Sequence, residues 1–356
     1  MIKKIHLLLV LVTSISFAQI PVDYYDSADG LEGYALKTAL RNIIANGHVA
    51  QSYGDLYDGY VLTHSDFYYE DDSTVLDYYS EDPNTTDPYN YTHGSDQCGN
   101  QNSEGDCYNR EHLMPQSVFD SDFPMQSDIH HVVPSDGRVN NFRGSLPFGN
   151  VASANWTSLN GSKRGTSSDD YNGDVFEPID EFKGEIARAM LYFATRYENQ
   201  VSSWSHPMLN GTNDQVYEDW FVDVLVQWHN DDPVNQSELD RNDAAYDFQG
   251  NANPFVDHPE YVNMIWAPEL SAPSSSIGRK EVVFYPNPVK VNTLTFDFPE
   301  SSKAVVSFYD VLGKKVLIRQ MSNIKNVLDI SPLTAGVYLV KIDQAGVTST
   351  LKLVRE

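Results

Sequence analysis

Apolar residues recur at helical spacing in three long segments of the chain. Between Gly33 and Ala45 they fall three or four residues apart, which predicts a helix with one face in the core. Gly184–Tyr197 shows the same amphipathic pattern. Trp220–Trp228 does so too, and Asp232-Pro233 would end that helix. These segments predict a helical core in the first three quarters of the chain.

Short runs of β-branched and aromatic residues predict strands. In the first part of the chain they are Tyr60–His64, Thr74–Tyr79 and Asn109–Leu113, and Pro115 would end the last of them. Towards the C-terminus seven such runs follow one another between turn signals, which is typical of a small β-sandwich. They are Val282–Tyr285, Leu294–Phe298, Ala304–Tyr309, Lys315–Ile318, Val327–Ile330, Val337–Ile342 and Ser349–Val354.

Three segments rich in small and polar residues are predicted to be loops or linkers. Ser80–Asp106 is a long loop whose tyrosines either stack on bases or face solvent. Asn155–Asn172 is a second loop, and its Lys163 and Arg164 either touch a nucleic-acid backbone or lie in a solvated turn. Residues 267–280 are rich in Pro and Ser and read as a linker. We therefore expect an α+β domain over 19–266 and an all-β domain over 281–356.

The N-terminus has the pattern of a secretory signal. Lys3 and Lys4 precede an apolar run from Ile5 to Val12, and Ser16 and Ala18 occupy the small-residue positions before Gln19. A membrane anchor is the alternative, but the apolar run is too short to span a bilayer. We expect a signal peptide over 1–18 and a secreted mature protein without a transmembrane segment.

The two cysteines, Cys98 and Cys107, are predicted to form a disulfide. An exported chain meets oxidising conditions, and the pair would close a short loop just before Glu111. A zinc site is the alternative, but Cys98, Cys107 and His93 offer too few ligands for one.

The formal net charge of −26 is unusual for a protein that binds polyanions, and its distribution matters more than its sum. Residues 19–270 hold 11 basic and 43 acidic residues. Seven of those basic residues fall within 108–188, where the net charge is only −5. Residues 271–356 reverse the balance, with 11 basic and 7 acidic residues. The charge pattern marks a domain boundary and leaves nucleic-acid chemistry possible around 108–188.

Candidate catalytic residues gather between Tyr108 and Asn150. Glu111 and His112 are adjacent, and Asn140 follows in a segment where Ser135 or Asp136 is the predicted cap of a helix over Asp136–Asn141. A carboxylate and a carboxamide can hold a hard cation such as Mg²⁺, and an imidazole can take a proton from water. In a regular strand, however, neighbouring side chains face opposite ways, so both can serve one site only if the strand bends or ends there.

The amino-acid sequence between Tyr108 and Asn150 resembles that of the endonuclease I family of secreted bacterial nucleases, which includes extracellular ribonucleases. The motifs are R-E-H-x-x-P and D-I-H-H-x-x-P-x-D-G-R-V-N-x-x-R, followed by K-G-E-I-A-R-A-M-L-Y-F and F-Q-G-N-A-N-P-F-V. The resemblance covers roughly residues 31–261 and implies a ββα-metal (HNH-like) fold. It further implies that both adjacent residues of the R-E-H motif serve the site and that the products carry 5′-phosphates.

Within that resemblance the expected roles are specific. Glu111 and Asn140 would hold Mg²⁺, with Mn²⁺ or Ca²⁺ as alternatives, and His112 would be the general base. Arg143 and Arg188 are the expected substrate contacts, although a salt bridge explains Arg188 equally well. Asn140 could instead be a turn residue. The neighbouring histidines 130 and 131 are expected to be structural, with one of them facing the core, and the Q-G-N-x-N-P-F segment is expected to form a tight turn.

The last domain resembles the C-terminal sorting domain (type A) of type IX (Por) secretion. The motifs that show this resemblance are F-Y-P-N-P-V, F-Y-D-V-L-G-K-K-V and L-T-A-G-V-Y-L-V-K-I. An immunoglobulin-like binding module would share the fold but would not explain these motifs. The resemblance implies a partner, the type IX secretion machinery, and a protein that is secreted or attached to the outer-membrane surface.

The sequence thus predicts a secreted, metal-dependent, non-specific endonuclease of DNA, RNA or both, and we expect a monomer. Two other function classes remain open. The first is a catalytically silent protein that binds nucleic acid or acts as an adhesin. The second is a phosphoesterase of small nucleotides.

Overall fold

The computed structural model describes residues 20–99, 101–267, 283–298, 303–310, 314–321, 325–344 and 347–355. The chain separates into two compact units, Met1–Ala272 and Pro273–Glu356. The expected signal peptide and residues 268–280 of the expected linker lie outside the described residues. Among the helices that the structure describes, none combines the length and the apolar character needed to cross a membrane.

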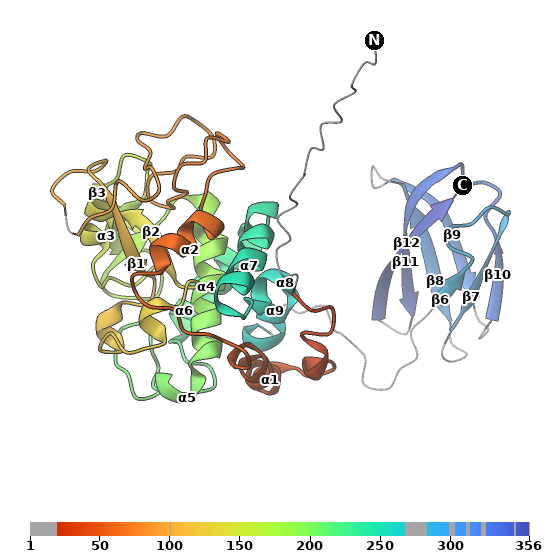
Figure 1. Cartoon of the computed structure of the whole chain (residues 1–356). Coiled ribbons are helices and arrows are strands. Elements are labelled where there is room, and N and C mark those ends of the chain that lie inside the picture. The colour runs from red at the N-terminus through yellow and green to blue at the C-terminus, as the bar shows by residue number, and fades with distance from the viewer. Residues whose placement is uncertain are drawn as a thin grey trace, which may run out of the picture. The chain divides into compact units, whose positions relative to one another are not determined.

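Helix α4 (Lys183–Arg196) lies at the centre of the N-terminal unit (Figure 1). Every residue from Gly184 to Thr195 is buried, because α1 (Gly33–Ala45) and α6 (Asp219–Asp231) pack against α4. The three predicted long helices are therefore confirmed. The remaining helices and 3-10 turns of this unit are η1 (Asp26–Ala28), α2 (Leu56–Thr63), η2 (Gln116–Val118), η3 (Met125–Ser127), α3 (Gly137–Arg143), η4 (Asp180–Phe182), α5 (Glu198–Val201), α7 (Gln236–Gln249), α8 (Pro254–Asp257) and α9 (Glu260–Trp266).

The predicted strand over Tyr60–His64 is wrong, because most of it lies in helix α2. The buried positions Leu56, Gly59, Tyr60 and Thr63 have the spacing of one helix face. A Cβ at Gly59 would lie only 2.7 Å from the Cδ1 atom of Ile129, so this helix approaches its neighbours more closely than a larger residue would allow. The β-branched and aromatic run masked this period, which becomes visible only when Leu56 is included.

The predicted strand over Thr74–Tyr79 is also absent from the named strands, although Val75 forms an isolated bridge with Ser65. This segment is buried and makes irregular backbone contacts, such as the hydrogen bond from the Val75 amide to the Tyr91 carbonyl at 2.8 Å. The long loop over Ser80–Asp106 is confirmed for the residues described.

Two small sheets complete the N-terminal unit. Strand β1 (Tyr108–His112) pairs antiparallel with β2 (Val132–Asp136). The second sheet has the order β3-β4-β5, formed by β3 (Val151–Thr157), β4 (Lys163–Ser167) and β5 (Asp174–Glu177). The predicted loop over 155–172 is thus partly wrong, because β3 includes residues 155–157 and β4 occupies residues 163–167. The expected turn after α7 is present, and Gly250 there has the left-handed φ of 78°.

The C-terminal unit consists of two antiparallel sheets with a shared apolar core. One sheet has the order β10-β7-β6 and the other β12-β11-β8-β9. Buried Phe296, Phe308 and Val340 belong to the core between them. All seven predicted strands are present: β6 (Val283–Tyr285), β7 (Thr293–Asp297), β8 (Ala304–Tyr309), β9 (Lys315–Met321), β10 (Lys325–Asp329), β11 (Gly336–Gln344) and β12 (Val347–Arg355).

Candidate active site

A strand pair followed by a short helix carries the predicted site residues. In the β1–β2 pair, Glu111 lies opposite Val133, and β2 runs directly into helix α3. Asp136 joins the two elements, because its Oδ1 atom accepts hydrogen bonds from the amides of Arg138 at 2.7 Å and Val139 at 2.8 Å. The predicted N-cap is therefore confirmed, and such a cap contributes about 1 kcal/mol to helix stability.

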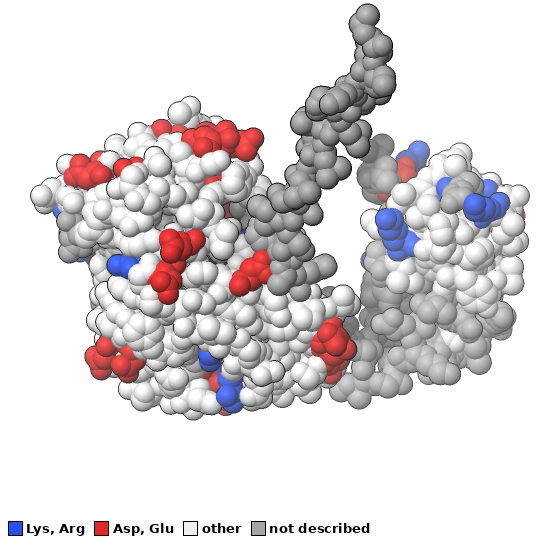
Figure 2. Space-filling model, viewed as in Figure 1, with Lys and Arg blue, Asp and Glu red and all other residues white. Residues whose placement is uncertain are grey.

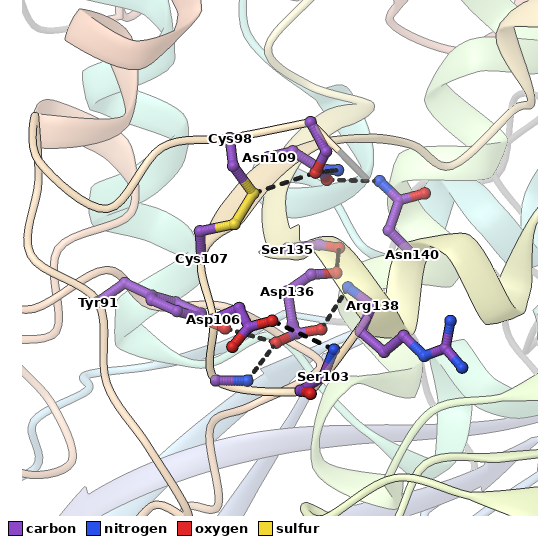
Figure 3. Close-up of a disulfide and its surroundings, with 12 residues drawn as sticks. Tyr91, Cys98, Ser103, Asp106, Cys107, Asn109, Ser135, Asp136, Arg138 and Asn140 are labelled. Carbon is purple, nitrogen blue, oxygen red and sulfur yellow. Dashed lines mark hydrogen bonds between the residues drawn. A yellow bond between two sulfur atoms is a disulfide. The ribbon is translucent and has the colours of Figure 1, made fainter. Parts of the chain in front are cut away.

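The predicted disulfide between Cys98 and Cys107 is present and fastens the long loop to this unit. The carbonyl of Cys107 accepts a hydrogen bond from the Gly137 amide at 2.9 Å, at the start of α3. The Oδ2 atom of Asp136 accepts further bonds from the Tyr91 hydroxyl and from the Gly105 amide, both on the loop. Figure 3 shows the disulfide, these bonds to Asp136, and the bond that joins Asn140 to Asn109.

The three residues expected to carry the chemistry line one pocket of about 400 Å³. Strand β1 ends at His112, so the side chains of Glu111 and His112 need not point to opposite faces as they would within a regular strand. Both line the pocket, and α3 brings Asn140 to it as well. Residues from β1, η2 and neighbouring loops complete it: Tyr53, Cys98, Gly99, Asn109, Arg110, Pro115, Gln116, Ser117, Gly144 and Ser145.

Glu111 is a buried carboxylate with two donors on the same oxygen. Its Oε1 atom accepts hydrogen bonds from the Tyr79 hydroxyl and from Arg143 Nη1, each at 3.0 Å. Burial raises the pKa of Glu111 to about 7, and the charge of Arg143 opposes that rise. No hydrogen bond to the second oxygen is found in the described part of the chain. This oxygen therefore remains available for a cation.

His112 has a defined tautomer. Its Nε2 atom lies 3.1 Å from the carbonyl oxygen of Gln126, which can only accept, so Nε2 carries the proton. Burial lowers the pKa of His112 to about 3, because charging the ring would cost desolvation energy. The ring is therefore neutral near pH 7, and Nδ1 offers an unprotonated lone pair. That is the state a general base requires.

Asn140 is fixed through its amide nitrogen. Nδ2 donates to Asn109 Oδ1 at 2.7 Å and more weakly to the Arg110 carbonyl at 3.4 Å. These bonds orient the carboxamide, so its oxygen is the atom left for a ligand. A carboxylate oxygen and an amide oxygen in one pocket form a donor set that suits a hard divalent cation. Glu111 and Asn140 thus fit the metal role expected of them.

The family model for endonuclease I matches residues 32–260. The chain belongs to the endonuclease I family. An extracellular ribonuclease of Bacillus amyloliquefaciens is 34% identical over 248 residues, which cover 68% of this chain and 78% of the relative. An extracellular deoxyribonuclease of Aeromonas hydrophila is 26% identical over 135 residues, which cover 37% of this chain and 50% of the relative.

The model for a secretion system C-terminal sorting domain matches residues 283–356. A solved Bacteroides vulgatus protein with an immunoglobulin-like β-sandwich fold matches 22% of this chain and 98% of its own, at 15% identity and a TM-score of 0.18. The sorting domain and the extracellular endonuclease I relatives identify the protein as secreted or held at the cell surface.

Arg143 lies beside the site but is fully buried, which does not favour the substrate contact expected of it. Besides Glu111, its guanidinium donates to the carbonyls of His112 at 2.8 Å, Leu113 at 2.6 Å and Leu146 at 3.1 Å. The Arg143 side chain therefore positions Glu111 and the end of β1 and leaves no exposed donor for a phosphate.

Arg188 is also fully buried, in the middle of α4, and it is not among the residues that line the pocket. Its Nε atom donates to Glu238 at 2.7 Å, and its Nη1 atom donates to the Asp232 carbonyl at 2.9 Å. The salt bridge that was the alternative for Arg188 is therefore present inside the core, and this position lends no support to the expected phosphate contact.

The neighbouring histidines 130 and 131 are both completely buried, whereas only one was expected to face the core. Their Nε2 atoms lie 2.9 Å from the Asn251 carbonyl and 2.7 Å from the Met125 carbonyl, respectively. Neither is among the residues found to line the pocket, which agrees with a structural place for both.

Sequence reasoning missed three residues of the site. Arg110 lines the pocket, and its guanidinium carbon lies 3.5 Å from the ring centroid of Tyr53. Its Nη1 atom donates a hydrogen bond to the Tyr53 carbonyl at 2.6 Å. Tyr79 reaches Glu111 from a different part of the chain. Arg110 stands inside the R-E-H motif and could have been found there, whereas no local signal identifies the two tyrosines.

The charge on the surface of the nuclease unit is mostly negative. Figure 2 shows acidic side chains over the visible face of this unit and only a few basic ones. Several basic residues near the site in sequence are used internally, since Arg143 and Arg188 are buried and Lys183 pairs with Glu177 at 2.7 Å. The positive charge that a polyanion could meet is therefore smaller than the sequence suggested.

Proposed function

We propose that this protein is a secreted endonuclease that hydrolyses phosphodiester bonds in RNA and DNA with a divalent cation, preferably Mg²⁺. The observation that carries the proposal is that Glu111, His112 and Asn140 line one pocket. RNA is included because the relative with the larger matched share is a ribonuclease, and DNA because a second relative is a deoxyribonuclease.

Glu111 and Asn140 would hold the cation through one carboxylate and one amide oxygen. When bound, the cation supplies charge that polarises the scissile phosphate and stabilises the leaving oxygen. Tyr79 and Arg143 hold the Glu111 carboxylate in place from the protein side. They donate to its Oε1 atom, which leaves the other oxygen for the cation.

His112 would act as the general base. Its Nε2–H is anchored on the Gln126 carbonyl, so the Nδ1 atom takes the proton from the attacking water. Hydrolysis that breaks the bond to the 3′ oxygen leaves a 5′-phosphate, as proposed for the products here.

Arg110 is the phosphate contact that we propose in place of the buried arginines. It lines the pocket, is only partly buried, and its stacking on Tyr53 limits the positions of the guanidinium. A planar guanidinium can bind two phosphate oxygens at once.

The test compares Glu111→Gln and His112→Ala with wild type in cleavage of matched RNA and DNA oligonucleotides across a Mg²⁺ titration. Glu111→Gln removes one negative charge, so higher Mg²⁺ should recover part of its rate. His112→Ala should lower the rate by about 10²- to 10⁴-fold at any Mg²⁺ concentration, because the missing group is a proton acceptor. His258→Ala, a change of a partly exposed histidine outside the pocket, is the control.

Three outcomes would contradict the proposal. Rescue of His112→Ala but not of Glu111→Gln by Mg²⁺ would reverse the two roles. Binding of oligonucleotides by the wild type without cleavage, and without any effect of EDTA, would indicate a silent binding protein. Hydrolysis of small nucleotides alone would indicate a phosphoesterase.

A further inference from the structure

A cluster of three carboxylates lies outside the nuclease pocket. Asp66, Glu70 and Glu81 each offer one oxygen, and these oxygens all lie within 4.8 Å of one another. Asp66 and Glu81 are each only 1% exposed, whereas Glu70 is exposed and leaves the cluster open to solvent on one side. None of the three is among the residues that line the pocket.

Among the described residues, the cluster brings three carboxylate groups together without a positively charged side chain paired to them. Backbone amides compensate Asp66, which accepts hydrogen bonds from Tyr68, Tyr69 and Glu70 at 3.0 Å each. Within the described ranges, no Lys, Arg or His nitrogen forms an ion pair with any member of the cluster. Three carboxylates this close repel one another strongly unless something neutralises them.

Glu81 supplies a second, independent observation that points to a ligand. Its Oε1 atom is buried and has no hydrogen-bond partner among the residues that the structure describes. Buried carboxylate oxygens are rarely left without a partner, because desolvation then goes uncompensated. The neighbouring oxygens of Asp66 and Glu70 lie within 4.8 Å of the Glu81 oxygen, so an unneutralised charge on Glu81 is unfavourable. A proton is thus one way to neutralise it, and a metal ion is the other.

We propose that Asp66, Glu70 and Glu81 form a second cation site, one that selects calcium and has a structural role. Calcium accepts six to eight oxygen ligands in irregular geometry, so carboxylates from separate segments together with water can satisfy it. Magnesium requires nearly ideal octahedral geometry and gives up its water reluctantly, which makes it the poorer occupant. The site does not depend on the nuclease function proposed above.

The cluster is connected to the nuclease pocket through one short segment. The Glu81 amide donates to the Asp77 carbonyl at 2.9 Å, and Asp77 Oδ2 accepts from the Asp136 amide at 2.6 Å, at the cap of α3. Between them, Tyr79 donates to Glu111. A cation held by Glu81 would therefore fix the segment that positions both the Glu111 carboxylate and helix α3.

The experiment measures cation binding by the full-length protein carrying Glu111→Gln, which weakens the pocket's own site. Calcium should raise its Tm by about 5–10 °C at a hundredfold excess over Kd. Magnesium at the same concentration should raise it less. Terbium should show luminescence sensitised by tyrosine, since Tyr68 and Tyr69 directly follow the cluster in sequence. No substrate is present, so the result is independent of whether the protein is a nuclease.

Glu81→Gln and Glu70→Gln, each added to that protein, should abolish the calcium effect. Glu70 is exposed, so its change should not prevent folding even if the change at the buried Glu81 does. Asp71→Asn is the matched control, because Asp71 is an exposed acidic neighbour outside the cluster. The proposal would be overturned if calcium left the Tm unchanged, or if calcium still raised the Tm of the protein with Glu70→Gln. Shared protons would then neutralise the three carboxylates.

Discussion

Replacing Arg143 by methionine separates a structural role from a substrate contact. Arg143 is fully buried and donates to one carboxylate and three carbonyl oxygens over 2.6–3.1 Å. Methionine keeps an unbranched apolar stem but lacks the guanidinium, so the Glu111 charge is left without its cation. Breaking one side of a buried ion pair costs about 3–5 kcal/mol. At about 2–4 °C per kcal/mol for a domain of this size, the Tm should fall by about 6–20 °C.

Thermal unfolding with circular dichroism detection measures this change, and Arg138→Met on the partly exposed face of α3 is the control. The double change Arg143→Met with Glu111→Gln should lose much less stability than the sum of the single changes, because no buried charge is then left unpaired. An unchanged Tm for Arg143→Met together with lost cleavage would refute this reasoning and return Arg143 to the role of a phosphate contact.

Three further predictions concern other parts of the molecule. Reducing the Cys98–Cys107 bond should lower stability by about 2–3 kcal/mol without changing the metal requirement, which unfolding and cleavage with and without reductant would show. A protein ending at Leu270 should keep its nuclease activity, and a folded but inactive product would contradict this. Burial lowers the pKa of His130 and His131 to about 4, so the unfolded state takes up protons first as pH falls. The free energy of unfolding should therefore decline between pH 6.5 and 4, by up to about 3 kcal/mol per histidine. Urea unfolding at a series of pH values measures this, and an unchanged free energy over that range would contradict the prediction.

The sequence alone determined the parts of the protein that depend on neighbouring residues. The cap at Asp136 and the helix that follows it are local, since the side chain bonds to amides two and three residues away. The amphipathic period of Gly33–Ala45 and the alternation in the seven C-terminal strands likewise record which side faces a core. The motif around Glu111 and His112 indicated the family for the same reason, because its residues are contiguous.

Only the tertiary structure decided which charges are exposed and which are buried. Arg188 pairs with Glu238 fifty residues later, and no local pattern distinguishes that pairing from a surface position. The close packing of Gly59 in helix α2 against Ile129 and Phe248 likewise joins residues that lie far apart in sequence. Tyr79 reaches Glu111 across 32 positions, and the acidic cluster joins two separate segments. Burial and pairing are consequences of long-range packing. They depend on distances between residues that are far apart in sequence, and local sequence patterns do not contain those distances.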